Sequence, residues 1–329
     1  MTVGAFMVLV ALGSLLTGLS TSIGALIAGG GIVTAVVVAF ALAWIPIAVI
    51  DFRRCTRETA LRAKVEADLD RHMSAERARA HEHDRLSRQV ESILADGGPA
   101  IVCQPILDID DRVVVGYEAL SRFTDGTRPD QWFAQAAEAG LGVELELAAI
   151  ANALQYMPTI AANAYLSVNA SPDALRDPRL MALIVANDPG RTVVELTEHV
   201  AFDDYSGYRR VVGQLHEAGA RIAVDDTGSG YGSFRHIVDL KPDIIKVDRA
   251  LVHRVDRDPA RRSLMIALVA FANDMGASLV AEGVERVEED IALRQWGVRF
   301  AQGYLYGRPT TPGQVHGVSM AAAVESGTS

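Results

Sequence analysis

One pattern constrains this chain more than any other: short apolar runs with strand character end, again and again, in acidic or amide residues. The pattern recurs between Tyr117 and Gly307, and amphipathic helical stretches separate most of the runs. Strands that alternate with helices predict a parallel sheet, and a closed parallel barrel places the carboxyl ends of its strands on one face. The polar residues at or near these ends are Glu118, Asn169, Glu195, Glu198, Asp225, Asp226, Lys246, Asp248, Glu282, Glu285 and Gln302.

Such a barrel would gather many oxygen ligands and one lysine, Lys246, around a single spot. Two carboxylates about 4 Å apart repel each other by about 4 kcal/mol at an effective dielectric near 20. The cluster is tolerable only if positive charge lies within it. Hard divalent cations prefer oxygen ligands, so they are the natural candidates.

The part of the chain that follows residue 95 is predicted to be a TIM-like (β/α)8 barrel. The run Val113–Tyr117 follows Ile101–Leu107 too closely for a crossover helix, so an antiparallel hairpin is expected there, giving the barrel one antiparallel strand. The other predicted strands are Ala164–Val168, Thr192–Leu196, Arg221–Val224, Asp243–Val247, Ala277–Val280 and Phe300–Leu305, with helices at Leu145–Tyr156, Tyr208–Ala218, Arg261–Met275 and Glu288–Trp296.

The chain is acidic, with a formal net charge of −10 and a pI of about 5.3. This charge argues against binding of a DNA or RNA polymer through a basic surface, but not against a small anionic substrate held through metal ions. Its two cysteines, Cys55 and Cys103, suggest no disulfide framework.

The N-terminal segment is free of charge. Residues Val3 to Ile50 contain no Asp, Glu, Lys, Arg or His, and as a helix they would be roughly 70 Å long. A bilayer core is about 30 Å thick, so two transmembrane helices are predicted over residues 1–50. The turn is expected at Ser20–Ser22 or, better, at Gly29–Gly31. A secretory signal peptide would need a basic start and a shorter apolar stretch.

Basic residues at Arg53, Arg54 and Arg57 follow this segment at once. The excess of positive charge predicts that this end is cytoplasmic, which makes the chain a multi-pass protein of the inner membrane, in contact with lipid.

Residues 51–95 are predicted to form a helical linker. Leu61, Val65, Leu69 and Met73 repeat every four residues, and Leu86, Val90 and Ile93 resume the stripe. So narrow a stripe is typical of a coiled-coil seam between two copies, which predicts a homodimer, whereas a solvated single helix is the alternative. Asp96–Pro99 ends the helix, and the barrel domain follows over residues 96–312, with a flexible tail at 313–329.

The segment Glu118-Ala119-Leu120 resembles the signature of the EAL family of cyclic-di-GMP phosphodiesterases. The resemblance covers about residues 95–312 and rests on an ordered set of motifs. These are QPI at Gln104–Ile106, SVNASP at Ser167–Pro172, ELTE at Glu195–Glu198, DDTGSGYGSF at Asp225–Phe234, KVD at Lys246–Asp248, EGVE at Glu282–Glu285 and QGYLYGRP at Gln302–Pro309.

This resemblance implies a two-metal hydrolase that converts cyclic-di-GMP to linear 5′-pGpG with two Mg²⁺ or Mn²⁺ ions. It implies that the first ion is bound by Glu118, Asn169, Glu195 and Asp225. Asp225 would bridge to a second ion, which Asp226 also binds and whose shell Glu282 completes.

The resemblance implies further roles. Lys246 would lie beside the attacking water. It would act either as a base or as electrostatic support, and the sequence does not decide between these two roles. Gln302 orients the water or the lysine, and Glu285 holds the metal shell in place. Arg122 contacts the phosphate or guanine of the substrate, and Gln104 contacts the substrate near the mouth.

One segment of the resemblance departs from the family pattern. The loop after Asp226 resembles the family's mobile loop beside the second metal, which couples metal binding to dimerisation, and Glu198 matches the glutamate that holds it. Thr227 stands in place of a phenylalanine, Ser229 of a threonine and Gly232 of a serine. No metal ligand is lost, but the change at Thr227 puts the packing of the loop in question.

The leading hypothesis is therefore a membrane-anchored phosphodiesterase that works as a dimer at the cytoplasmic face and lowers the level of a second messenger. An inactive EAL domain that serves as a cyclic-di-GMP receptor is the first alternative, and an adaptor protein is the second. Glu118, Asp225, Asp226 and Lys246 are all present, which favours catalysis.

Overall fold

The computed structural model describes residues 31–196, 205–227 and 233–311, which form parts of two compact units, Met1–Ala80 and His81–Ser329. In the first unit, the described residues belong to the long helix α2 (Gly31–Ala95). Within the described part of the chain, no helix is both long and apolar enough to cross a membrane. The predicted transmembrane hairpin is therefore not supported, and its first helix falls outside the described residues.

The end of α2 belongs to the barrel domain. Leu86 and Val90 are buried, and Val90 forms a cluster with Trp132, Ala136 and Leu145 of the helices that follow. The predicted coiled-coil seam is thus wrong for this part of the stripe, because its apolar side chains pack within their own chain. Leu61, Val65 and Leu69 of the first unit remain exposed.

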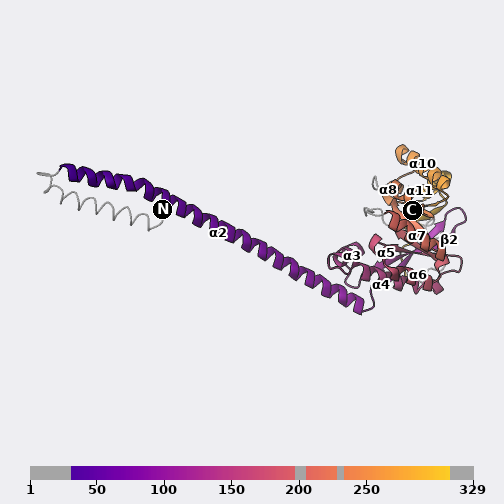
Figure 1. The fold of residues 1–329 in the computed structure, drawn as a ribbon. Coiled ribbons are helices and arrows are strands. Elements are labelled where there is room, and N and C mark those ends of the chain that lie inside the picture. Colours follow the sequence, from indigo (N-terminus) through magenta and orange to yellow (C-terminus); the bar gives the residue numbers. More distant parts are fainter. Residues whose placement is uncertain (1–30, 197–204, 228–232, 312–329) are drawn as a thin grey trace, which may run out of the picture. The chain divides into compact units, whose positions relative to one another are not determined.

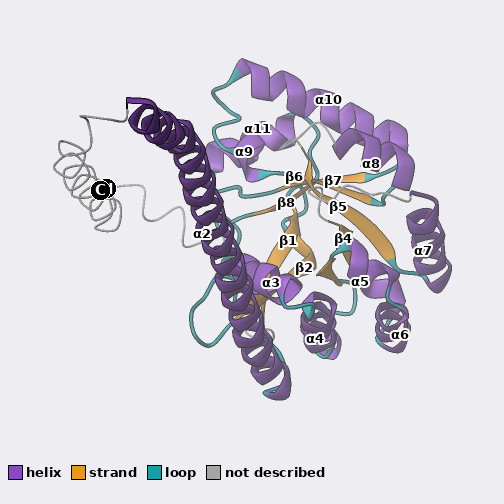
Figure 2. Cartoon of the chain, turned by 60° about the vertical axis from the view of Figure 1, so that its left-hand side comes forward, coloured by secondary structure: helices purple, strands orange, loops and turns teal. Residues whose placement is uncertain are grey.

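Eight strands close into a barrel in which each strand pairs with the next along the chain. Strand β1 runs antiparallel to both β2 and β8, and the other neighbours are parallel, which confirms the predicted TIM-like barrel with one antiparallel strand (Figure 2). The strands are β1 (Ala100–Asp108), β2 (Val113–Arg122), β3 (Tyr165–Ala170), β4 (Thr192–Leu196), β5 (Arg221–Thr227), β6 (Ile244–Val247), β7 (Ser278–Ala281) and β8 (Phe300–Gln302).

Helices follow the parallel strands along the chain and surround the barrel (Figures 1 and 2). The four predicted helices correspond to α4 (Gly142–Leu154), α7 (Tyr205–Ala218), α10 (Pro259–Met275) and α11 (Val287–Gln295). The elements that the sequence reading missed are short, and several begin at a proline, which is well tolerated in a first turn. They are α3 (Pro129–Glu138), η1 (Met157–Thr159), α5 (Pro172–Arg176), α6 (Pro178–Ala186), η2 (Pro189–Arg191), α8 (Ser233–Leu240) and α9 (Arg249–Val252).

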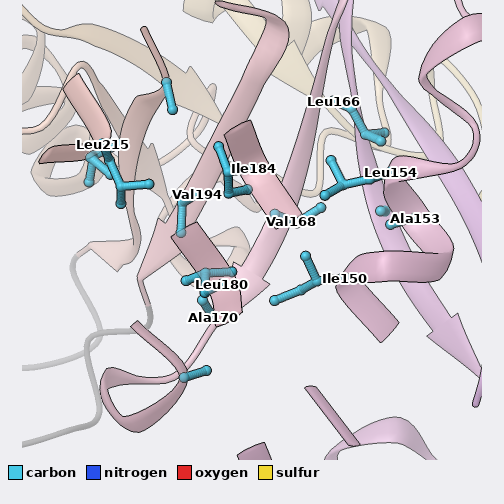
Figure 3. Close-up of a cluster of buried hydrophobic side chains, with 14 of the residues drawn as sticks. Ile150, Ala153, Leu154, Leu166, Val168, Ala170, Leu180, Ile184, Val194 and Leu215 are labelled. Atoms are coloured by element: carbon cyan, nitrogen blue, oxygen red, sulfur yellow. The ribbon is translucent and has the colours of Figure 1, made fainter. Parts of the chain in front are cut away.

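Alternation along the strands divides the core into two parts. Outward residues such as Leu166, Val168 and Val194 pack against Ile150 and Ile184 of the surrounding helices (Figure 3). A second cluster fills the barrel itself and contains Ile106, Tyr165, Val193, Ala223, Ile244 and Val280. Since strand side chains alternate with a period of two, the next residue on the inner face lies two positions further along. In β4 to β8, the residue two positions after the apolar interior residue is polar. A layer of polar side chains therefore lies above the apolar interior of the barrel.

Gly303, directly after β8, allows two loops at this polar layer to cross closely. A Cβ atom at this position would lie 2.1 Å from the carbonyl oxygen of Val284 and 2.3 Å from its amide nitrogen. The amide of Val284 also donates to Gln302. The end of β8, which carries Gln302, is therefore held against the loop that carries Glu282, at a close contact that only glycine permits.

Gly303→Ala should therefore destabilise the protein by about 1–3 kcal/mol, the usual range for forced backbone shifts. Gly213→Ala is the matched control, because Gly213 lies in helix α7 with open space around it and alanine there should stabilise the helix by about 1 kcal/mol. Chemical denaturation of both variants checks this. If Gly303→Ala is as stable as the wild type, the close contact between Gly303 and the backbone of Val284 is contradicted.

Candidate active site

The polar layer at the carboxyl end of the barrel, here called the mouth, draws on every strand. Each strand contributes one residue from within its length, except that β7 contributes Glu282, the position directly after it. The contributors from β1 to β8 are Gln104, Glu118, Asn169, Glu195, Asp225, Lys246, Glu282 and Gln302. Most of these side chains are buried, while Asn169 is exposed.

Lys246 lies at the centre of four carboxylates. Its Nζ atom is 2.7 Å from Glu195 Oε2 and 2.6 Å from Glu282 Oε1. It is also 3.5 Å from Glu118 Oε2 and 3.5 Å from Asp225 Oδ2. Only 1% of the lysine side chain is exposed. One ammonium thus holds together a cluster whose carboxylates would otherwise repel one another.

Burial and charge shift the ionisation of this cluster in opposite ways. Burial raises the pKa of Glu195 to about 8 and raises the pKa of Glu282 as well, although the charge of Lys246 opposes both shifts. Burial alone would lower the pKa of Lys246, but the surrounding carboxylates outweigh it and hold that pKa well above its ordinary value. Without metal, Lys246 is therefore a charged ammonium, which suits electrostatic support better than proton abstraction.

The raised carboxyl pKa predicts a pH dependence of stability. Above about pH 4.3 the unfolded chain has released the glutamate proton, whereas folded Glu195 keeps it up to about pH 8. The unfolding free energy of the metal-free protein should therefore fall as the pH rises through this window, by at most about 1.4 kcal/mol per pH unit for one proton. Denaturation at several pH values measures the slope, and Glu195→Gln should reduce it. A stability that rises with pH equally in both proteins would contradict the assignment.

Amide side chains tie the cluster to the barrel wall. Gln302 Nε2 donates to Glu118 Oε2 at 2.7 Å and to Gln104 Oε1 at 3.0 Å. Asn169 Nδ2 donates to Glu118 Oε1 at 3.2 Å. Gln104 in turn donates to the carbonyl of Gly307 at 3.1 Å. Both polar atoms of Gln104 thus have hydrogen-bond partners in the barrel wall, and its predicted contact with substrate stays a prediction.

Other predicted site residues lie outside the cluster. Glu285 pairs with Arg249 at 2.9 Å. Arg122 is exposed, donates to the carbonyl of Ser121, and lines two hollows of about 400 and 520 Å³. Asn169 lines the smaller hollow too, which places Arg122 beside the mouth. Asp226 belongs to β5, but its side chain is outside the described part of the structure, as are Glu198 and most of the loop after Thr227.

The cluster fits a divalent cation. One carboxylate oxygen from each of Glu118, Glu195 and Asp225 lies within 4.8 Å of the other two. The buried Oε1 atom of Gln302 also has no hydrogen-bond donor among the residues that the structure describes. Carboxylate and amide oxygens are the ligands that hard cations such as Mg²⁺ and Mn²⁺ prefer.

Two buried residues near the site were missed in the sequence. Ser167 donates its hydroxyl to Glu195 Oε1. Glu289 accepts hydrogen bonds from the amides of Arg254, Glu285 and Arg286, and so fixes the loop that carries Glu282. Ser167 could have been found from its position, because it lies two residues before Asn169 and therefore on the same face of the strand. Glu289 could not, because its sequence context is that of an ordinary surface residue of a helix.

Comparison with known proteins decides the family. The profile of the EAL domain matches residues 85–309, which is most of the chain. This chain belongs to the EAL domain family. The match begins within α2, in agreement with the packing of Leu86 and Val90 against the rest of the EAL domain.

Relatives of this EAL domain protein include two proteins of Escherichia coli, each named as a probable cyclic di-GMP phosphodiesterase. PdeD is 28% identical over 68% of this chain and 44% of its own length, and PdeB is 30% identical over 62% of this chain and 41% of its own length. The chain thus spans less than half of either relative. The structure of Klebsiella pneumoniae BlrP1 in complex with calcium and cyclic di-GMP is 30% identical, with a TM-score of 0.58, over 64% of this chain and 55% of the other.

Proposed function

We propose that this EAL domain hydrolyses cyclic-di-GMP to linear 5′-pGpG. The observation that carries the proposal is the buried Lys246 surrounded by four carboxylates at the barrel mouth. Its support from relatives is that PdeD and PdeB are named as probable phosphodiesterases for this nucleotide and that BlrP1 binds it together with calcium or manganese.

The proposed metal ligands are the oxygen atoms of the cluster. Glu118, Asn169, Glu195 and Asp225 would bind one Mg²⁺ or Mn²⁺ ion, and Asp225, Asp226 and Glu282 a second. When bound, such a pair of ions lowers the pKa of a shared water and stabilises the charge of the phosphodiester.

The side chains of this chain would position the reaction. The Lys246 ammonium brings a fixed positive charge into a site from which water is largely excluded, where it favours the negative charge that develops on phosphorus-bound oxygens. Gln302 holds Glu118 through its amide at 2.7 Å. The exposed guanidinium of Arg122 is suited to a phosphate oxygen or a guanine edge at the rim.

Metal dependence tests this proposal. The full chain is incubated with cyclic-di-GMP and either Mn²⁺, Mg²⁺ or a chelator, and the remaining nucleotide is measured. Consumption with either cation and none with the chelator is expected. A nucleotide that stays intact but binds to the protein would instead identify a receptor with an inactive EAL domain.

The membrane anchor over residues 1–50 remains a proposal that rests on the uncharged sequence and on the arginines after it. The full chain should sediment with membranes and resist extraction by high salt, whereas a chain that lacks residues 1–50 should be found in the supernatant. Extraction of the full chain by salt alone would contradict the anchor.

The homodimer likewise remains a proposal, now restricted to the exposed part of the stripe, Leu61 to Met73. Aspartate at both Val65 and Leu69 should shift the protein from dimer to monomer in sedimentation experiments and lower its turnover. An unchanged oligomeric state and turnover would contradict this role.

A further inference from the structure

Ser167 is a buried hydroxyl directly beneath the mouth. It lies on β3 and has no exposed surface. In the parallel pairing of β3 with β4, Ser167 is opposite Val193 and Asn169 is opposite Glu195. Ser167 and Asn169 share the inner face of β3, since they are two positions apart.

The two oxygens of Glu195 have different partners. Ser167 Oγ donates to Oε1, and Lys246 Nζ lies 2.7 Å from Oε2. Glu195 is 1% exposed, so water does not replace either partner. The serine therefore holds Oε1, while Oε2 contacts Lys246, which itself lies 3.5 Å from carboxylate oxygens of both Glu118 and Asp225.

We propose that Ser167 is a positioning residue that orients Glu195 for metal binding. This inference rests on the proposed function, because it concerns the same cation site. Hydrogen bonds that orient a metal ligand from behind reduce the freedom that the ligand loses on binding, and their removal typically lowers metal affinity by about 10- to 100-fold. Ser167 itself reaches neither solvent nor substrate, since its side chain is enclosed by the strands.

A second buried hydroxyl provides a matched control. Thr192 lies at the start of β4, is also fully buried, and donates its hydroxyl to the carbonyl of Asp188 at 3.0 Å. Thr192→Val removes a buried hydroxyl from a strand next to Ser167 without changing a partner of the carboxylate cluster.

The test compares Ser167→Ala and Thr192→Val in the full chain. Mn²⁺ affinity of the metal-stripped proteins is measured by calorimetry and by the electron paramagnetic resonance of free Mn²⁺. We expect the Kd for Mn²⁺ to rise about 10- to 100-fold in Ser167→Ala and to stay at the wild-type value in Thr192→Val. With Mn²⁺ at saturation, the KM for cyclic-di-GMP should be the same in all three proteins.

Ser167→Cys serves if the alanine variant fails to fold, because it keeps a similar volume but has only a weak donor; a loss of Mn²⁺ affinity in the same direction is expected. Folded variants at Ser167 with wild-type Mn²⁺ affinity would overturn the inference while leaving the proposed function in place. A wild-type protein that binds no Mn²⁺ would overturn both.

Discussion

Lys246→Met should be much less stable than the wild type when divalent cations are absent, and Mn²⁺ should restore most of the lost stability. Methionine has a similar length but no charge, so the variant leaves the four acidic side chains without the positive charge that lies between them. Loss of one partner from a buried ion pair typically costs about 3–5 kcal/mol. A bound cation supplies the missing positive charge, so its stabilising effect should be larger in the variant than in the wild type.

The measurement is the unfolding free energy of both proteins with a chelator and with Mn²⁺. Lys241→Met is the matched control, because Lys241 is exposed and exposed charges contribute little to stability. If Lys246→Met is as stable as Lys241→Met with the chelator, the ammonium does not hold the cluster together. If Mn²⁺ stabilises the Lys246 variant no more than the control, the cation does not bind in its place.

Glu118→Gln should abolish most of the hydrolysis and weaken Mn²⁺ binding. The substitution keeps the shape of the side chain but removes a charge that Asn169, Gln302 and Lys246 all face. Metal ions in such sites contribute several kcal/mol to catalysis, and each 1.36 kcal/mol is a tenfold change in rate. A fall in kcat of at least about a hundredfold is therefore expected.

Glu144→Gln is the control for this experiment. Glu144 lies on α4, is partly exposed and pairs with Arg179 at 3.2 Å, and it is not one of the carboxylates around Lys246. Its kcat and Mn²⁺ affinity should match the wild type. A Glu118→Gln enzyme that retains the wild-type rate would contradict the proposed ligand set.

The barrel and most of the mouth follow from local sequence, because both depend on the alternation of strand side chains. Glu195, Asp225 and Lys246 each come two positions after an apolar residue of the barrel interior, so one rule places all three. The antiparallel β1 was predictable from the short connection to β2. Short helices such as α5 and α6 were not, because they bury few residues and show little periodicity.

Other features depend on contacts between distant segments. Val90 fits a coiled-coil stripe equally well, and only its packing against Trp132 and Leu145 makes it part of the domain core. Similarly, the motif that contains Glu282 also contains Glu285, but the loop turns after β7 and directs Glu285 to Arg249. Sequence spacing cannot distinguish these outcomes, since it does not specify which surfaces meet.

We propose above all that the carboxylate cluster around Lys246 directs water onto a cyclic dinucleotide. The most direct test is a single-turnover reaction of the full chain with cyclic-di-GMP and Mn²⁺ in water enriched in oxygen-18, followed by mass spectrometry. Linear pGpG that carries one heavy oxygen on its terminal phosphate is the predicted result. Cyclic-di-GMP recovered intact, or a linear product without the heavy oxygen, would contradict the account.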